Sequence, residues 1–404
     1  MSPLGIEAPD LPGYSGLRPL RPEMRLVLEC VPPAPEPGVI RDIVREGVDW
    51  AESIDLASRH RVASLLYHWC MRSCPEAVPQ SAMGQLRSIA ASYARQSLRC
   101  TGELFRLVDS LAARRIPAIT FKGPAIAWSI YLNPSLRPMS DIDVLIQRRD
   151  VAAAAEVLAG LGYRAQTPTA RIVFHRYGAQ LPFQHPNGLA VDLHWHLGPL
   201  HFQKWFPDDA VWTRAAHIEI AGRSIRSLAP EDLLRFLCMH AAKHGWDNLR
   251  DLGDIARLIN SNVDCRAALA AAQHLGGLRP LLVGLALVRD LARGRLPASI
   301  NDRIAHEPRV PELLAQAKIS LLGRFAPDDS PASGLRRYWQ LLERPSDRAR
   351  LCWGVIQPNA LDWCWCPLPG PLYAAYFLLK PLRHAAKHFL RNNARSTAVS
   401  PQQV

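Results

Sequence analysis

The sequence lacks the features that would direct it into a membrane or an oxidising compartment. It has no window of about 18 or more uncharged apolar residues, and no N-terminal basic segment followed by the apolar run of a signal peptide. Its nine cysteines form no Cys-x-x-Cys pair. Free core thiols are therefore favoured over zinc ligands or disulfides, even for the helix-spaced Cys70 and Cys74. We expect a cytoplasmic protein without a membrane span.

Lysine is also scarce, and the positive charge comes mainly from arginine. Only six of the 48 basic residues are lysines, and 36 acidic residues leave a formal charge of +12. Such an excess favours polyanionic partners such as nucleotides, nucleic acid or anionic lipid. Because abundant Arg, Ala and Pro often accompany GC-rich coding, composition alone can account for much of the charge. The charge narrows the class of partner but leaves the chemistry open.

The chain is long enough for more than one cooperative unit. Its 404 residues exceed the size of about 250 to 300 residues at which a single core stops growing. Hydrophobic residues make up 48% and charged residues 21%, which disfavours disorder, collagen and coiled coil. No repeat of about 20 to 50 residues is present. We expect a main domain with attachments.

Changes in composition and periodicity divide the chain into five segments. Residues 1–38 contain nine prolines and predict an extended or disordered tail. Residues 39–112 have a helical period, and residues 113–225 alternate strands with helices. The helical period returns over residues 226–345, and a Trp- and Pro-rich segment with a basic tail completes residues 346–404. An α/β segment therefore lies inside a helical protein.

The central segment contains the turn and strand signals. A strand, a tight turn and a helix are predicted between residues 116 and 131, and a second strand over residues 141–146. Asp150 is expected to cap the next helix. Residues 172–184 and 189–197 predict a hairpin, because the Asn-Gly pair between them is a strong turn signal.

Two strands of this segment carry candidate metal ligands. Side chains alternate along a strand, so Asp141 and Asp143 share one face, and Asp192, His194 and His196 share the polar face of a later strand. Mg²⁺ prefers oxygen ligands and is commonly held by one or two carboxylates together with substrate phosphates. The three aspartates therefore form a candidate magnesium site. The alternatives are a chance Asp-x-Asp, which a chain of this length carries about once, and a sheet with one solvated face.

A candidate anion site precedes the first pair of aspartates. Gly123 can cap a helix and Pro124 suits its first position, which leaves backbone N–H groups and the positive end of the helix dipole at the turn. Lys122 and Arg137 are placed to bind phosphate oxygens there. The alternative is an ordinary strand-to-helix turn with two solvated cations.

The helix expected after Pro230 carries a further polar cluster. Positions 233, 237, 240 and 244 share a face, so His240 and His244 extend a stripe of leucines and point inward. The pair could hold zinc, but no Glu follows His240, and histidines of a core or cleft are favoured. The cluster continues with Lys243, Trp246, Arg250 and Asp254, which we interpret as the wall of a cleft.

Together, these motifs resemble a little-characterised family of bacterial nucleotidyltransferases in the DNA polymerase β-like superfamily. The similarity rests on the order of Phe121-Lys-Gly-Pro-Ala-Ile, Asp141-Ile-Asp143-Val-Leu-Ile and Val191-Asp192-Leu-His-Trp. It extends upstream to His60-Arg-Val-Ala-Ser-Leu-Leu-Tyr and downstream through His240-x-x-Lys-His-Gly-Trp. It covers roughly residues 40 to 390.

The resemblance implies an α+β fold, in which a small mixed β-sheet core is flanked by N- and C-terminal helical regions. It also implies that Asp141 and Asp143 bind Mg²⁺ and that Asp192 completes the site. The superfamily usually has glycine followed by glycine or serine at the first motif, whereas Pro124 follows Gly123 here. Because proline lacks a hydroxyl and a backbone N–H donor, phosphate contacts are expected to depend more on Lys122.

The expected activity is metal-dependent transfer of a nucleoside monophosphate from an NTP such as ATP to an acceptor hydroxyl or phosphate, with release of pyrophosphate. Lys122, Gly123 and Arg137 would contact the nucleotide, as would the helix residues His240, Lys243 and His244. The acceptor stays open among a small molecule, a peptide, a protein and RNA, as do the preferred base and the oligomeric state. Two alternatives are a non-catalytic nucleotide-binding scaffold and a nucleic-acid or membrane-surface binder built on the basic tail.

Overall fold

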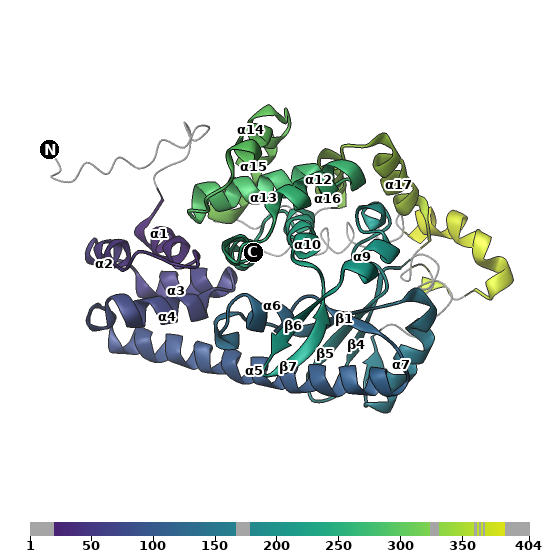
Figure 1. Cartoon of the computed structure of the whole chain (residues 1–404), viewed down its shortest axis with the longest axis horizontal. Helices are drawn as coiled ribbons and strands as arrows, with labels where there is room; N and C mark the ends of the chain where they lie inside the picture. Colours follow the sequence, from purple (N-terminus) through teal and green to yellow (C-terminus); the bar gives the residue numbers. More distant parts are fainter. Residues whose placement is uncertain are drawn as a thin grey trace, which may run out of the picture.

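A computed structural model of the protein describes residues 20–166, 178–323 and 331–358, together with 362, 365, 366 and 368–383. In this part of the chain seven strands form one mixed sheet, in the order β3-β4-β5-β2-β1-β7-β6. Helices precede and follow the sheet in the chain and pack around it (Figure 1). The predicted α+β class, a mixed sheet flanked by helical regions, is confirmed.

The strands of the sheet are short. They are β1 (Ala118–Thr120), β2 (Asp141–Ile146), β3 (Arg164–Ala165), β4 (Gln180–Gln184), β5 (Ala190–His194), β6 (Ala216–Ile220) and β7 (Arg223–Ser227). β2 pairs in parallel with β5 and antiparallel with β1, and β1 pairs in parallel with β7. The predicted hairpin is the antiparallel pair β4 and β5. Residues 172–177 of its expected first strand lie outside the described residues.

Along the chain, helices precede, interrupt and follow the strands of the sheet. Before and within it lie α1 (Pro22–Glu29), α2 (Pro37–Arg45), α3 (Trp50–Arg59), α4 (Ala63–Ser73), α5 (Gln80–Ala113), α6 (Pro124–Ser129), α7 (Val151–Gly160) and α9 (Asp208–Arg214). After it come α10 (Pro230–Lys243), α11 (Leu249–Asn260), α12 (Cys265–Leu275), α13 (Leu278–Leu291), α14 (Ala298–His306), α15 (Val310–Leu322), α16 (Pro331–Leu341) and α17 (Pro345–Ile356). The boundaries of the five segments remain predictions.

The expected N-terminal tail is helical where the structure describes it. Prolines at the first position of a helix are tolerated because that N–H has no partner within the helix, and α1 and α2 both begin with one. Leu26 and Val27 of α1 are fully buried, and Arg257 of α11 donates a hydrogen bond of 2.7 Å to the Val31 carbonyl. The prediction of an extended or disordered tail is therefore wrong from Pro22 onward. Residues 1–19 lie outside the described residues.

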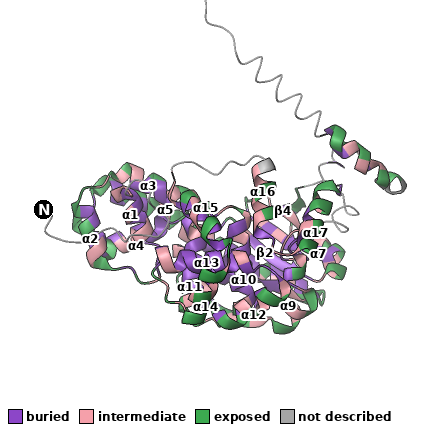
Figure 2. Ribbon diagram, turned by 90° about the horizontal axis from the view of Figure 1, so that it is seen from above, coloured by how far each residue is buried: buried purple, intermediate pink, exposed green. Residues whose placement is uncertain are grey.

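Alternation along β2 separates its side chains into two layers. Ile142 belongs to the hydrophobic cluster that β2 forms with α5 and α7, whereas Leu145 belongs to the cluster that includes α10. Asp141 and Asp143 share the face of Leu145, so their carboxylates lie on the α10 side of the sheet. Figure 1 shows α5 along one side of the sheet and α10 on the other, and Figure 2 shows buried residues concentrated in α10, α13 and β2.

The C-terminal part of the chain is described only in pieces. Lys380 donates a hydrogen bond to the Gln357 carbonyl, and Arg383 pairs with Asp362 at 2.6 Å, so both cations of this part have partners within the protein. The rest of the predicted basic tail, from residue 384 onward, lies outside the described residues. Among the helices that the structure does describe, none has the length and apolar character needed to cross a bilayer.

Candidate active site

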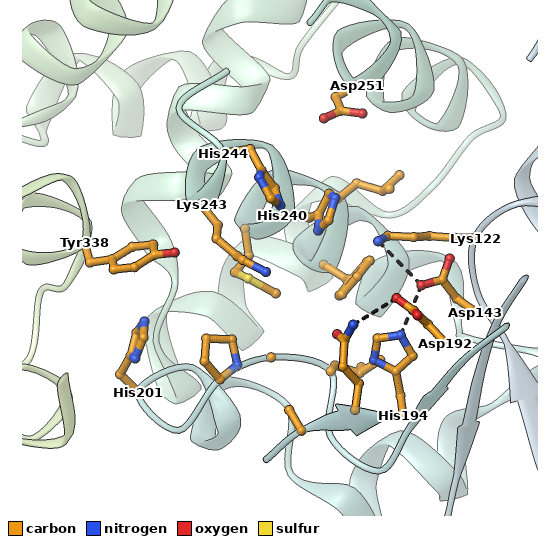
Figure 3. Close-up of a pocket in the computed structure, with 18 of the residues that line it drawn as sticks. Lys122, Asp143, Asp192, His194, His201, His240, Lys243, His244, Asp251 and Tyr338 are labelled. Carbon is orange, nitrogen blue, oxygen red and sulfur yellow. Dashed lines mark hydrogen bonds and ion pairs between the residues drawn. The ribbon is translucent and has the colours of Figure 1, made fainter. Parts of the chain in front are cut away.

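A cavity of about 1050 Å³ opens between the sheet and the C-terminal helices. Its walls come from the β1–α6 turn, β2, β4, β5, α10, α11, α16 and α17. Ligand pockets usually measure about 300 to 1,000 Å³, so this one has room for a nucleotide and further groups. Figure 3 shows the aspartates at one end, His201 and Tyr338 at the other, and Lys243 between them.

Two carboxylates and an imidazole converge at the aspartate end. Asp143 of β2 lies beside Asp192 of β5 in the parallel register, so both side chains point to the same face. His194 Nε2 lies 3.0 Å from Asp143 Oδ1, and ligand atoms of Asp143, Asp192 and His194 all lie within 4.8 Å of one another. Asp141 lines the same cavity but lies outside this group. Its predicted role as a metal ligand stays a prediction.

The two converging carboxylates differ in their affinity for protons. Burial acts to raise the pKa of Asp143, but the Lys122 ammonium and the hydrogen bond from His194 outweigh it and bring that pKa down to about 2. Burial raises the pKa of Asp192, and the neighbouring Asp143 charge adds to this. Gln180 of β4 donates a hydrogen bond of 2.9 Å to Asp192 Oδ2 and fixes that carboxylate. Asp143 is therefore held as a carboxylate, and Asp192 is the more basic of the two.

The predicted Lys-Gly-Pro turn lies directly against these groups. Lys122 Nζ lies 3.7 Å from Asp143 Oδ1 and 5.3 Å from the centre of the Phe236 ring. Gly123 has φ +51°, and a Cβ there would lie 2.9 Å from the Asp141 carbonyl oxygen. Helix α6 begins at Pro124, as predicted. Only glycine allows the turn to approach β2 this closely.

Helix α10 supplies the opposite wall with three predicted residues. His240 stacks on Phe236 with ring centres 5.7 Å apart, and His244 lies 4.7 Å from His240. Burial, together with the charge of Lys122, lowers the pKa of His240 well below its usual value, so its ring is neutral. Burial also lowers the pKa of Lys243, which has no hydrogen-bond or ion-pair partner in the described part of the chain. Lys243 is a cation available to a ligand.

Arg137 lines the cavity but is already engaged. Its Nε and one terminal nitrogen donate to both oxygens of Asp254 at 2.8 to 3.0 Å, and Tyr131 donates to the same carboxylate at 2.8 Å. The side chain is only 5% exposed. One edge of the guanidinium, formed by Nε and a terminal nitrogen, is therefore used by Asp254, and the predicted phosphate contact stays a prediction. The ion pair joins the segment before β2 to α11.

The structure places His196 away from the cavity, and it adds two residues, Gln180 and Tyr338, that the sequence did not indicate. His196 follows the end of β5 and its Nδ1 lies 3.3 Å from Asp208, so it does not continue the polar face of Asp192 and His194 toward the cavity. Gln180 and Tyr338 line the cavity from β4 and α16. The period of two along β5 indicated that His194 lies on the face of Asp192. The sequence around Gln180 and Tyr338 contains no pattern that relates these residues to the aspartates.

A comparison of the sequence with models of known protein families shows the family to which the chain belongs. A mixed sheet with paired aspartates facing a cavity of cations agrees with the expected nucleotidyltransferase class. Residues 46–293 match the model of a family described as uncharacterised nucleotidyltransferase, and the chain belongs to this family. No curated protein matches the chain.

Solved structures with partial similarity include three proteins. The lincosamide antibiotic adenylyltransferase LnuA, bound to lincomycin, is 18% identical, with 39% of this chain and 94% of that chain covered and a TM-score of 0.29. The antibiotic-resistance factor ANT(2'')-Ia is 15% identical, with coverages of 51% and 97% and a TM-score of 0.30. An antigenic nucleotidyltransferase-like protein from Paracoccidioides brasiliensis is 15% identical, with coverages of 52% and 95% and a TM-score of 0.29.

Proposed function

We propose that this protein transfers a nucleoside monophosphate from an NTP to an acceptor in a metal-dependent reaction that releases pyrophosphate. The observation that carries the proposal is the convergence of Asp143, Asp192 and His194 within 4.8 Å at one end of a cavity. Two lysines, Lys122 and Lys243, line the same cavity. Carboxylates that converge beside cations suit a substrate with a chain of phosphates and a divalent ion.

The residues present fit a divalent cation. Metal–oxygen bonds of about 2.0 to 2.1 Å allow ligand atoms up to about 4.2 Å apart to share one Mg²⁺, so small adjustments within the group suffice. Asp143 and Asp192 would hold the ion, with Asp141 beside them, while His194 orients Asp143 through its hydrogen bond. A bound Mg²⁺ would neutralise the triphosphate and polarise the α-phosphorus.

The side chains of the protein account for the rest of the reaction. Lys122 and Lys243 would bind phosphate oxygens and hold the triphosphate in line with the acceptor. Asp192, whose pKa burial raises, would take the proton of the acceptor hydroxyl. The acceptor oxygen then forms a bond to the α-phosphorus as the bond from that phosphorus to the pyrophosphate oxygen breaks. The leaving group carries away the electron pair of the broken bond.

Asp143→Asn tests this assignment. The substitution keeps the size of the side chain but removes the charge, so transfer should fall by more than the 10- to 100-fold typical of losing an outer partner of a metal ligand. Transfer is measured as movement of label from [α-³²P]ATP onto components of a clarified cell extract. Asp302→Asn, an exposed position on α14, is the matched control and should retain full activity. Undiminished transfer by Asp143→Asn would refute the assignment.

A further inference from the structure

The cavity continues beyond Lys243 into an uncharged end. We call it the ring subsite, and it comprises His201 of the segment after β5, Tyr338 of α16, and residues of α17 such as Leu351 and Val355. Among the described residues that line the cavity, none from residues 197–201, α16 or α17 carries a charge. The aspartate end and the ring subsite therefore differ sharply in polarity.

His201 is a buried polar group of the ring subsite. It is 6% exposed, and its Nε2 is buried without a hydrogen-bond partner among the described residues. Burial, with the nearby charge of Lys243, lowers the pKa of His201 to about 4, so the ring is neutral at physiological pH. A buried polar atom without a partner is destabilising, and a ligand that offers a hydrogen bond would relieve that cost.

Aromatic rings surround this imidazole. The Tyr338 ring centre lies 5.1 Å away at an angle of 49°, and the Phe202 ring centre lies 4.2 Å away. Figure 3 shows Tyr338 and His201 on the side of Lys243 opposite to the aspartates. A planar, uncharged ring with donors and acceptors at its edge suits this pair, because it would stack on Tyr338 and offer a hydrogen bond to His201 Nε2.

We propose that the ring subsite binds the nucleobase of the donor nucleotide, with His201 reading its edge and Tyr338 stacking on its face. The inference deepens the proposed function and depends on it. It assigns the phosphates to the charged part of the cavity, where Lys122 and Lys243 lie near the carboxylates, and the base to the uncharged end. His201 and Tyr338 are therefore specificity-determining residues for the nucleotide.

A comparison of ATP with inorganic tripolyphosphate, which lacks the base and ribose, isolates this subsite. Dissociation constants for both are measured by calorimetry with Mg²⁺ on the full-length protein. Wild type should bind ATP more tightly than tripolyphosphate, and His201→Ala should weaken ATP binding about tenfold, with less than a twofold effect on tripolyphosphate. His201→Gln, which keeps a hydrogen-bonding group, should recover part of the loss.

Further variants control for folding and for general effects. Tyr338→Leu should also weaken ATP binding selectively. Two controls, His274→Ala at an exposed position of α12 and Tyr67→Phe on α4, should bind both ligands like wild type. Thermal melts establish that each variant is folded. His201→Ala should also narrow the spread of affinities among ATP, GTP, CTP and UTP.

The outcomes separate this inference from the proposed function. Equal affinity of wild type for ATP and tripolyphosphate, or equal losses for both ligands in folded His201→Ala, would overturn the ring subsite while leaving transfer intact. Absence of label transfer by wild type from any NTP would overturn the proposed function, whatever the binding ratios. A selective loss of ATP binding in His201→Ala, together with measurable label transfer by wild type, would support both the ring subsite and the proposed function.

Discussion

At the scale of single residues, the proposed chemistry depends on the charge and orientation of the Asp143 carboxylate. Its carboxylate is almost fully buried, and Lys122 and His194 keep it ionised. Period-two alternation predicted that Asp141 and Asp143 share a face and that Asp192 lies on the polar face of a later strand, whereas the family resemblance alone implied that Asp192 joins them. The hydrogen bond from His194 depends on the parallel register of β2 and β5, which the sequence does not specify.

His194→Gln should lower the rate of transfer by about 10- to 100-fold, because the carboxylate of Asp143 loses the partner that orients it. The neighbouring His196→Gln provides the control, since His196 contacts Asp208 outside the cavity and not Asp143 or Asp192. Steady-state kinetics with ATP should show the loss mainly in kcat. Equal activity of the two variants would mean that His194 has no part in positioning Asp143.

Buried histidines predict how stability depends on pH. His60 is 5% exposed, and burial together with the Arg59 charge lowers its pKa to about 4. The unfolded chain, with a histidine pKa near 6.5, binds the proton first as pH falls, so unfolding becomes easier between about pH 6.5 and 4. His60 should contribute a loss of about 3 kcal/mol over this window.

Urea denaturation at several pH values checks this prediction. The free energy of unfolding of His60→Gln should vary less between pH 6.5 and 4 than that of wild type, whereas exposed His274→Gln should behave like wild type. A His60→Gln protein with the same pH dependence as wild type would contradict the burial of an uncharged imidazole at this position.

At the scale of elements, the turn between β1 and α6 determines how closely Lys122 and Gly123 approach β2. Local signals predicted this strand, turn and helix correctly because Gly and Pro act through their own backbone geometry. The same reasoning failed for α1, where many prolines were interpreted as a tail. Burial of Leu26 and Val27 against distant helices stabilises α1, and no local pattern carries that information.

Gly123→Ala should destabilise the protein by about 1 to 3 kcal/mol, because its backbone conformation disfavours a side chain and the new methyl group would clash with the Asp141 carbonyl. Gly84→Ala, inside α5 with open space around it, should instead be neutral or stabilising by up to about 1 kcal/mol. Chemical denaturation of both variants makes the comparison. Similar effects at the two positions would contradict the close approach of the turn to β2.

At the scale of the whole molecule, long-range contacts join the sheet to the helices that complete the cavity. Arg137 and Asp254 are 117 residues apart and both buried, and Arg257 of α11 reaches back to the segment after α1. Sequence patterns indicated a phosphate contact for Arg137 and a place in a cleft wall for Asp254, but did not indicate that the two residues are partners. His201 and Tyr338 escaped prediction for the same reason, since only the folded chain brings them together.

Arg137→Met should lower the free energy of unfolding by about 3 to 5 kcal/mol, because it leaves Asp254 buried without its cation. The double variant Arg137→Met, Asp254→Asn should lose less than the sum of the two single variants, since neither charge remains. Denaturation of the four proteins in a double-mutant cycle measures this coupling. Strict additivity would show that the pair does not connect the sheet to α11.

The central claim, transfer of a nucleotidyl group, is tested most directly by the position of the label. Wild type is incubated with Mg²⁺, clarified cell extract and ATP labelled at either the α- or the γ-phosphate, with Asp143→Asn as control. We predict that α-label moves onto an acceptor, that γ-label appears in pyrophosphate, and that neither occurs with Asp143→Asn. Movement of γ-label onto the acceptor, or equal movement of α-label by the variant, would contradict the account.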